Sequence, residues 1–267
     1  MQNPTNARIA LIIPLLLIAS GCGPQEPTAQ EKAQLAAGYA SYSSKEYEQA
    51  MAQADQYLSK RPHGPGSPEA LYLKGRALEA RISQDQNQAK QNLQAARAAY
   101  IEALNQKPRQ PLESYIRTSL GNVAYFQDDY STAVQQWTSA YPKLDNNDVK
   151  AWLLYRTGIA YARLGQFDGA DKSFAAVQQR FPNTEPARRA REHQGSRAFY
   201  VQLATFASSS GADAASAALR KEGVTPVNIK DPQGRQLLRV GPVPTYAQAL
   251  NLKSRYTAKY PDAIVVP

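Results

Sequence analysis

Hydrophobic and polar positions divide the chain into two regions with different periods. Over residues 31–193, apolar residues recur every three to four positions, as in amphipathic helices. Over residues 200–206 (YVQLATF) they alternate, which is the signature of a strand with one buried face. Strict alternation puts Val201, Leu203 and Thr205 on one side and Tyr200, Gln202 and Ala204 on the other. The pattern predicts a helical region followed by a module that contains a sheet.

A pattern of small and aromatic residues repeats through the helical region. Its clearest copy, over residues 154–182, contains Gly158, Tyr161, Phe167, Ala170 and Phe174. Glycine and alanine let two helices approach closely, aromatic residues fill the gaps between hairpins, and proline ends the second helix. The first glycines of the copies, at 38, 75, 121 and 158, are separated by 37, 46 and 37 residues.

This pattern resembles the tetratricopeptide repeat, a helix–turn–helix unit of 34 residues. The resemblance implies an α-helical solenoid over residues 31–195 that binds a protein partner on its concave face, with Trp137, Tyr161 and Phe174 in its core. The longest gap contains the polar residues 84–94, which extend a helix or a loop. They are either a solvated insertion or a specificity element of a groove.

The N-terminal 21 residues resemble an export signal. Arg8 precedes an apolar run, residues 9–19, that is too short to span a bilayer comfortably. The run ends in Ala19-Ser20-Gly21-Cys22, which resembles the lipobox of bacterial lipoproteins, with Ala19 where leucine is usual. The resemblance implies a signal peptide over residues 1–21, lipidation of Cys22 and a tether over residues 22–30. The alternative is an ordinary signal peptide with an incidental cysteine.

Gly23, in place of aspartate, resembles an outer-membrane address facing the periplasm if the organism is Gram-negative. The formal charge is +9 for the 267 residues, and losing Arg8 with the signal makes it +8, which favours anionic partners. Residues 186–197 (PARRAREHQGSR) contain Arg188, Arg189 and Arg191, which either cap the solenoid or bind phosphate. Because the protein is expected to be exported, we expect no nucleic-acid partner.

Residues 196–267 predict a small α+β domain. Strand-like segments occupy 200–206, 225–230, 235–241 and 263–266, with a turn at 231–234. Helices are expected before Gly223, with Ala215, Ala218 and Leu219 on one face, and over residues 246–260. The order β-α-β-β-α-β is ferredoxin-like, with two helices covering one face of four antiparallel strands and the other face open.

The segments YVQLATF, LLRVGPVPTYAQALNLKSRY and AIVV, in this order, resemble the SPOR domain. The resemblance implies binding to peptidoglycan, with a preference for glycan strands stripped of stem peptides, which accumulate at the division septum. The family's glycan contacts fall on Gln202, Thr205, Arg235 and Leu237. Arg235 stands where an aromatic residue is frequent and Leu237 where a basic one is, so glycan affinity is expected to be altered.

The alternation itself places Tyr200, Gln202, Arg235, Leu237 and Arg239 on the open face, because Leu238 and Val240 point into the core. Glutamine and arginine can hydrogen-bond sugar hydroxyls, acetamido groups and the lactyl carboxylate. Thr205 joins this face only if the strand ends or bulges there. The alternative is that the polar residues are merely solvated.

The residue types of the chain argue against a metal site and against catalysis. One cysteine excludes an intramolecular disulfide, and the two histidines, His63 and His193, are far apart, so we expect no metal site and no cofactor. Glycosidases need two closely placed carboxylates. The acids of the C-terminal region, none expected on the open face, are Asp213, Glu222, Asp231 and Asp262.

The sequence therefore predicts a lipid-anchored envelope protein without catalytic activity. Its SPOR-like domain would bind denuded peptidoglycan and its repeats would recruit an unidentified protein partner. The alternative is an outer-membrane assembly or scaffold lipoprotein that acts through its repeats only.

Overall fold

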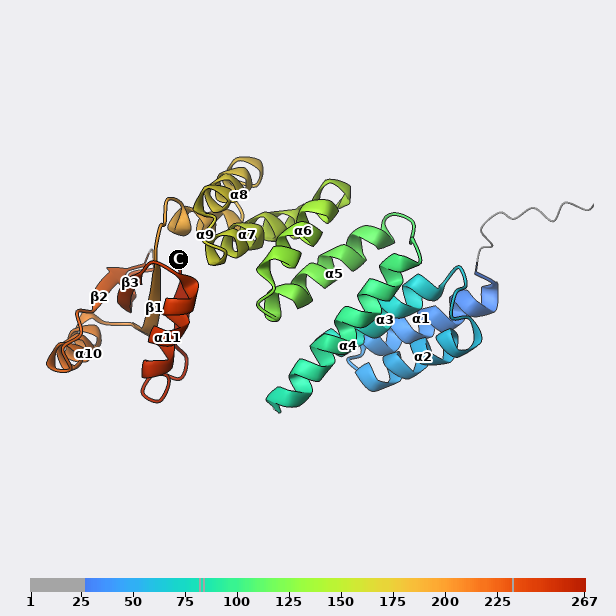
Figure 1. Cartoon of the computed structure of the whole chain (residues 1–267), viewed down its shortest axis with the longest axis horizontal. Coiled ribbons are helices and arrows are strands. Elements are labelled where there is room, and N and C mark those ends of the chain that lie inside the picture. Colours follow the sequence, from blue (N-terminus) through green and yellow to red (C-terminus); the bar gives the residue numbers. More distant parts are fainter. Residues whose placement is uncertain (1–26, 82, 84, 232) are drawn as a thin grey trace, which may run out of the picture.

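The computed structural model describes residues 27–81, 83, 85–231 and 233–267. The expected signal peptide and Cys22 lie outside these residues. Within them, nine α-helices precede a four-stranded sheet. The helices are α1 (Ala29–Ser43), α2 (Tyr47–Lys60), α3 (Ser67–Ala80), α4 (Gln86–Asn105), α5 (Leu112–Phe126), α6 (Tyr130–Ala140), α7 (Asn147–Arg163), α8 (Phe167–Arg180) and α9 (Glu185–His193). A short 3₁₀ helix, η1 (Tyr141–Lys143), follows α6. The helices stack as hairpins along the long axis of the molecule, with the sheet at the far end (Figure 1).

The hairpins α3–α4, α5–α6 and α7–α8 each close on a glycine that faces an aromatic ring, whereas Gly38 of α1 faces Leu73. A Cβ added at Gly158 would lie 2.4 Å from Phe174, and one added at Gly75 would lie 2.4 Å from Tyr100. Gly121 meets Trp137 in the same way, at 2.5 Å. The rings of Trp137, Phe174 and Tyr100 are almost completely buried. The expected tetratricopeptide-type packing, in which glycine admits a core aromatic, is therefore confirmed.

The polar insertion extends a helix. From Gln86 onward it forms the first turns of α4, which has 20 residues, and Asp85 caps it by accepting a hydrogen bond from the Asn87 amide at 2.8 Å. Asn92 is buried and donates to the carbonyl of Arg81. Figure 1 shows the N-terminal turns of α4 extending beyond α3.

Helix α9 closes the solenoid. Its inner side places Ala187 and Ala190, both fully buried, against α7 and α8. Its outer side carries the arginines, and Arg188 and Arg189 both pair with Glu185 at 2.6 and 2.8 Å. A solenoid needs such a polar outer side at its last hairpin, so the capping interpretation of the basic segment agrees with this geometry.

The C-terminal module comprises β1 (Phe199–Phe206), α10 (Ser209–Lys221), β2 (Val227–Lys230), β3 (Gln236–Val243), α11 (Tyr246–Tyr256) and β4 (Ile264–Val266). Its strand order is β2-β3-β1-β4, with every neighbouring pair antiparallel, as expected for the ferredoxin-like order. Both helices contribute to one hydrophobic cluster with the buried side chains of the strands. That cluster centres on Val201, Leu203, Leu238, Val240 and Leu219. Helix α11 ends at Tyr256, four residues before the expected end.

A β-bulge changes the side of the sheet on which the end of β1 points. The β1–β3 register shifts between Gln202 and Ala204. After the shift Thr205 is exposed, and Phe206 packs against the core cluster. The strict alternation expected for residues 200–206 is therefore wrong at Thr205, which lies on the same side as Gln202. An extra residue in one strand of an antiparallel pair has this effect.

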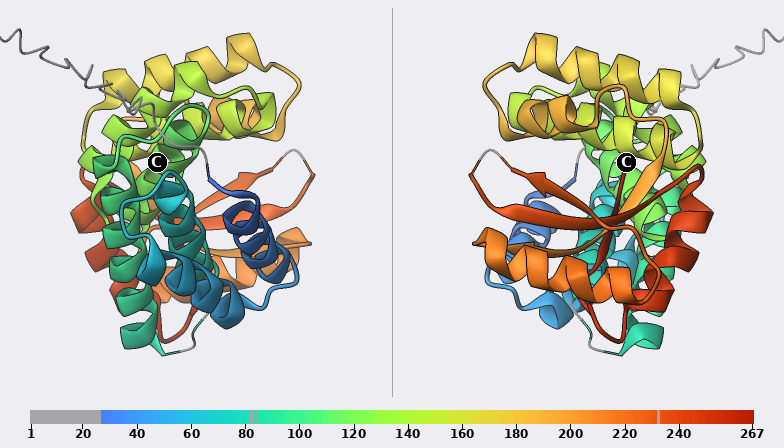
Figure 2. Two further views of the ribbon diagram at one scale, coloured as in Figure 1. Left: turned by 90° about the vertical axis from the view of Figure 1, so that its right-hand side faces the viewer. Right: turned by 90° about the vertical axis from the view of Figure 1, so that its left-hand side faces the viewer.

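The module packs directly on the last hairpin. One hydrophobic cluster contains Phe174 and Ala187 of the solenoid together with Phe199 of β1 and Ala249 of α11. Tyr246 of α11 meets the ring of Tyr130 edge-on at 5.7 Å. The connection between α9 and β1 is held as well, because Arg197 pairs with Asp171 at 2.7 Å. Figure 2 shows the module against the end of the solenoid from two sides.

Candidate functional site: a groove between the sheet and the last helix

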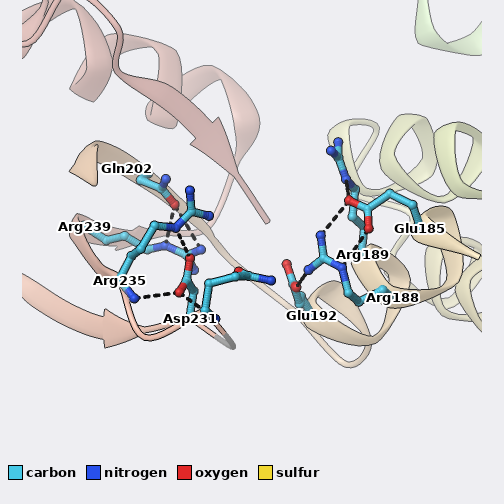
Figure 3. A network of polar contacts seen from close by, with 9 residues as sticks. Glu185, Arg188, Arg189, Glu192, Gln202, Asp231, Arg235 and Arg239 are labelled. Atoms are coloured by element: carbon cyan, nitrogen blue, oxygen red, sulfur yellow. Dashed lines mark hydrogen bonds and ion pairs between the residues drawn. The ribbon is translucent and has the colours of Figure 1, made fainter. Parts of the chain in front are cut away.

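The uncovered face of the sheet forms one wall of a groove, and the end of the solenoid forms the other. The sheet wall consists of Gln202, Thr205, Asp231, Gln233, Arg235, Leu237, Arg239, Ile264 and Val266. The solenoid wall consists of Tyr155, Arg188, Arg189, Glu192 and His193. The face expected to be open is therefore partly enclosed by α7 and α9 (Figure 3).

Gln202 is the centre of the polar contacts on the sheet wall. Its Oε1 accepts hydrogen bonds from Nε and Nη2 of Arg239 at 3.3 and 3.2 Å, and its Nε2 donates to Thr205 Oγ1 at 3.3 Å. Gln202 and Arg239 lie side by side because they are partners in the register of β1 and β3, and the bulge turns Thr205 to the same side of the sheet. The three side chains offer both donors and acceptors to a ligand, as sugar recognition requires.

The β2–β3 turn supplies a second polar group. Asp231 accepts hydrogen bonds from the amides of Gln233 and Arg235 and from Arg235 Nε, the last at 2.7 Å. Burial pushes the pKa of Asp231 upward, but the hydrogen bonds from Arg235 outweigh it and hold the pKa below its usual range. Asp231 is thus an ionised carboxylate in the groove, which corrects the expectation that no acid of this region reaches the uncovered face.

The solenoid wall places a neutral histidine between arginines. Burial, and then the charges of Arg239 and Arg189, lower the pKa of His193 to about 4. Its ring stacks on Tyr155, with centroids 6.1 Å apart and planes at 25°. The pKa of Arg239 is lowered by burial, against the opposing effect of Glu192. The groove therefore has an aromatic floor of one tyrosine and an uncharged imidazole, flanked by cationic side chains.

The comparison with protein families matches this module as a unit. Residues 195–267 match the SPOR domain. Residues 24–106 match a second family model, described as an outer membrane lipoprotein. No curated protein matches the chain.

Solved structures of helical repeat proteins are similar to part of the chain. A tetratricopeptide repeat protein from Parabacteroides merdae ATCC 43184 is 15% identical, with a TM-score of 0.49, and the match covers 61% of this chain and 58% of that one. YrrB, described as a TPR protein with an unusual peptide-binding site, is 19% identical with a TM-score of 0.48 over 62% of this chain and 79% of its own.

The matched families associate the chain with the cell envelope, and the SPOR domain indicates peptidoglycan binding. The families are binding and scaffold families. In the described part of the chain, no group of three or more histidine, cysteine, aspartate or glutamate side chains is placed to hold a metal ion. None of the described helices is long and apolar enough to cross a membrane.

The structure brings together five of the six sheet residues expected to contact glycan. Gln202, Thr205, Arg235, Leu237 and Arg239 all line the groove of the SPOR domain, whereas Tyr200 does not. Tyr200 lies on β1 opposite Val266 and is close enough to Arg239 to affect its pKa. Whether these residues bind glycan stays a prediction.

Sequence reasoning missed the solenoid wall and Asp231. Residues 186–197 contain a basic cluster with Arg188 and Arg189, but nothing in their pattern indicates that these side chains face the SPOR sheet. The sequence Asp-Pro-Gln-Gly predicts a turn, but it does not by itself indicate that the aspartate carboxylate lies beside the ends of the strands in the groove.

A second pocket lies beside the groove, where the repeats meet the C-terminal module, and it shares Arg189 and His193 with the groove. It is lined by Asn122 and Phe126 of α5, Trp152 and Arg156 of α7, and the end of the chain at residues 264–267, among others. Arg156 donates to Asn122 Oδ1 at 3.1 Å, and Phe126 is 60% exposed. Exposed aromatic and arginine side chains are typical of surfaces that bind proteins.

Proposed function

We propose that this protein is a lipid-anchored component of the cell envelope that binds denuded glycan strands of peptidoglycan through its SPOR domain, at the division septum, and recruits a protein partner through its repeats. Lipidation of Cys22 supplies the anchor, and no chemical reaction is catalysed. The match of residues 195–267 carries the proposal, and the Gln202–Arg239–Thr205 group supports it with donors and acceptors on the uncovered face.

Co-sedimentation with cell-wall sacculi tests the glycan part. The whole chain, purified in mild detergent, should pellet with amidase-treated sacculi and less with intact sacculi. Gln202→Ala removes the acceptor that orients Arg239 and should weaken binding about tenfold, the effect of losing a hydrogen bond to a charged group. Gln56→Ala, an exposed glutamine on α2, is the control. Equal pelleting of the wild type with both kinds of sacculi would contradict the denuded-strand preference, and no pelleting would contradict glycan binding.

The anchor and the partner need separate experiments. Cys22→Ser should move the protein from the membrane to the soluble fraction, and an unchanged distribution would contradict lipid anchoring. For the partner, a photo-crosslinking residue in place of Phe126 should capture a protein that the same residue at Tyr115, an exposed position on α5, does not. Capture at both positions would show non-specific contact.

A second candidate function is an outer-membrane assembly or scaffold role that uses the repeats alone. The match of residues 24–106 to the outer membrane lipoprotein model favours it. Deleting the SPOR domain is a poor test, because Phe199 and Ala249 belong to the core of the last hairpin. Gln202→Ala with Arg239→Ala is better: a septal fluorescent fusion should become dispersed under the first proposal and keep its position under the second.

A further inference from the structure

The groove contains cationic side chains from outside the SPOR domain. Arg188 and Arg189 lie on α9, in the solenoid, and line the groove opposite Gln202 and Arg239. Figure 3 shows the two groups facing each other, with Asp231 and Glu192 between them. A SPOR domain alone would lack this wall, so the solenoid decides part of what the groove can bind.

The charges along the groove favour an anion. Four guanidinium groups line it, those of Arg188, Arg189, Arg235 and Arg239, against the two carboxylates of Asp231 and Glu192. The carboxylates are already engaged, since Asp231 accepts from Arg235 and Glu192 accepts from Arg188 Nη1 at 2.5 Å. His193 adds no charge at neutral pH. Glu185, which pairs with Arg188 and Arg189 without lining the groove, balances the solenoid wall, so the net positive charge lies on the sheet wall, where Arg235 and Arg239 accompany one carboxylate, Asp231.

The two arginines of α9 are held in position before any ligand arrives. Arg188 donates three hydrogen bonds, two to Glu185 and one to Glu192. Arg189 donates from Nε to Glu185 at 2.8 Å, and its guanidinium lies over the Trp152 ring, 5.3 Å from the centroid. A guanidinium has five N–H donors, so donors remain for a ligand. Holding a side chain in its binding geometry reduces the entropy lost on binding.

We propose that Arg188 and Arg189 recognise the lactyl carboxylates of denuded glycan. This inference rests on the proposed function. Hydrolysis of the amide between the lactyl group and the stem peptide consumes one water, releases the peptide as an amine and leaves a carboxylate on the sugar. Intact strands have a neutral amide at that position. A guanidinium therefore distinguishes the two states by charge, and the solenoid adds to the preference for stripped strands that we propose for the SPOR domain.

Oligosaccharide probes of equal length test this inference with the whole chain. A denuded glycan tetrasaccharide of alternating N-acetylglucosamine and N-acetylmuramic acid has lactyl carboxylates, and chitotetraose has none. A third probe is the same glycan with its stem peptides attached. Calorimetric titration should show wild-type protein binding the denuded probe tighter than both others.

The variants assign the preference to α9. The two side chains are 36% and 46% exposed, so each contact is worth about a fivefold change in Kd, the upper range for a surface ion pair. Arg188→Ala with Arg189→Ala should weaken binding of the denuded probe about tenfold or more. It should weaken chitotetraose binding much less, because that probe offers the arginines no carboxylate. Arg191→Ala is the matched control: it lies on the same helix, and its side chain donates to the Pro182 carbonyl. Thermal melts confirm that each variant folds.

The possible outcomes distinguish a failure of the α9 arginines to bind the lactyl carboxylate from a failure of glycan binding itself. If the double variant keeps the preference of the wild type, or binds denuded glycan more tightly, α9 does not read the carboxylate and the inference fails while glycan binding stands. Equal wild-type affinity for the peptide-bearing probe also overturns it, because stem-peptide carboxylates would then satisfy the arginines. If wild-type protein binds no probe and pellets with no sacculi, the proposed function itself fails.

Discussion

Tyr246 couples the SPOR domain to the solenoid, and its removal should uncouple them. Its ring meets Tyr130 and Phe199 at centroid distances of 5.7 Å each, both edge-on. The guanidinium of Arg163 lies 4.6 Å from its centroid and also contacts the Tyr130 ring at 5.1 Å. Two aromatic pairs and one partly desolvated cation–π contact together contribute about 3 kcal/mol to the junction.

The expected result is a separate unfolding transition. In the wild type, the shared core should make the SPOR domain and the last hairpin unfold together. In Tyr246→Ala the SPOR domain loses about 3 kcal/mol of support, which for a domain of this size lowers its melting temperature by more than about 10 °C. Scanning calorimetry should show a new low-temperature transition, and small-angle scattering should show a larger radius of gyration.

The control is Tyr115→Ala, which removes a tyrosine that is 41% exposed on α5, away from the junction. Its thermogram should match that of the wild type. A single transition at the wild-type temperature in Tyr246→Ala, with unchanged scattering, would refute the reasoning. The shared core would then owe its stability to Phe199 and Ala249 rather than to the aromatic contacts.

Three further predictions concern the stability of the solenoid end. Gly158→Ala should destabilise the protein by about 2 kcal/mol, because overpacking against Phe174 exceeds the gain in helix propensity. In urea titration, adding Phe174→Leu to Gly158→Ala should recover part of this loss. If the destabilisations of the two single variants simply add in the double variant, there is no clash between these residues. Lowering the pH from 7 to 5 should reduce the free energy of unfolding by about 2 kcal/mol through His193. Below pH 6.5 the unfolded chain binds a proton at this histidine, whereas the folded chain, in which its pKa is about 4, does not. His193→Gln should abolish this part of the pH dependence, and an unchanged slope of unfolding free energy against pH would contradict it. Asp171→Asn removes the charge that binds Arg197 and the Gly195 amide, so limited proteolysis should cut residues 194–198 faster, and an unchanged rate would show that the connection is held by other contacts.

Local sequence patterns determined the elements and their order. The spacing of glycine and aromatic residues in each hairpin records a contact between two helices that follow each other in the chain. The alternation around Val201 and Val240 records which side of each strand is buried. These patterns are local because the periods of helices and strands are properties of the backbone, so the solenoid, the β-α-β-β-α-β order and most of the uncovered sheet face could be derived from them.

Tertiary structure alone decided how the groove is built. The bulge that turns Thr205 toward Gln202 depends on the pairing of β1 with β3, which lies more than thirty residues further along the chain. The position of α9 against the sheet depends on Phe199 and Ala249 entering the core of the last hairpin. Arg188 has the same pattern of neighbours in the sequence whether it faces water or a ligand groove. The hydrophobic period of a helix or strand shows which of its sides is polar. It does not show which other polar surface lies opposite that side, because this depends on how separate elements pack together.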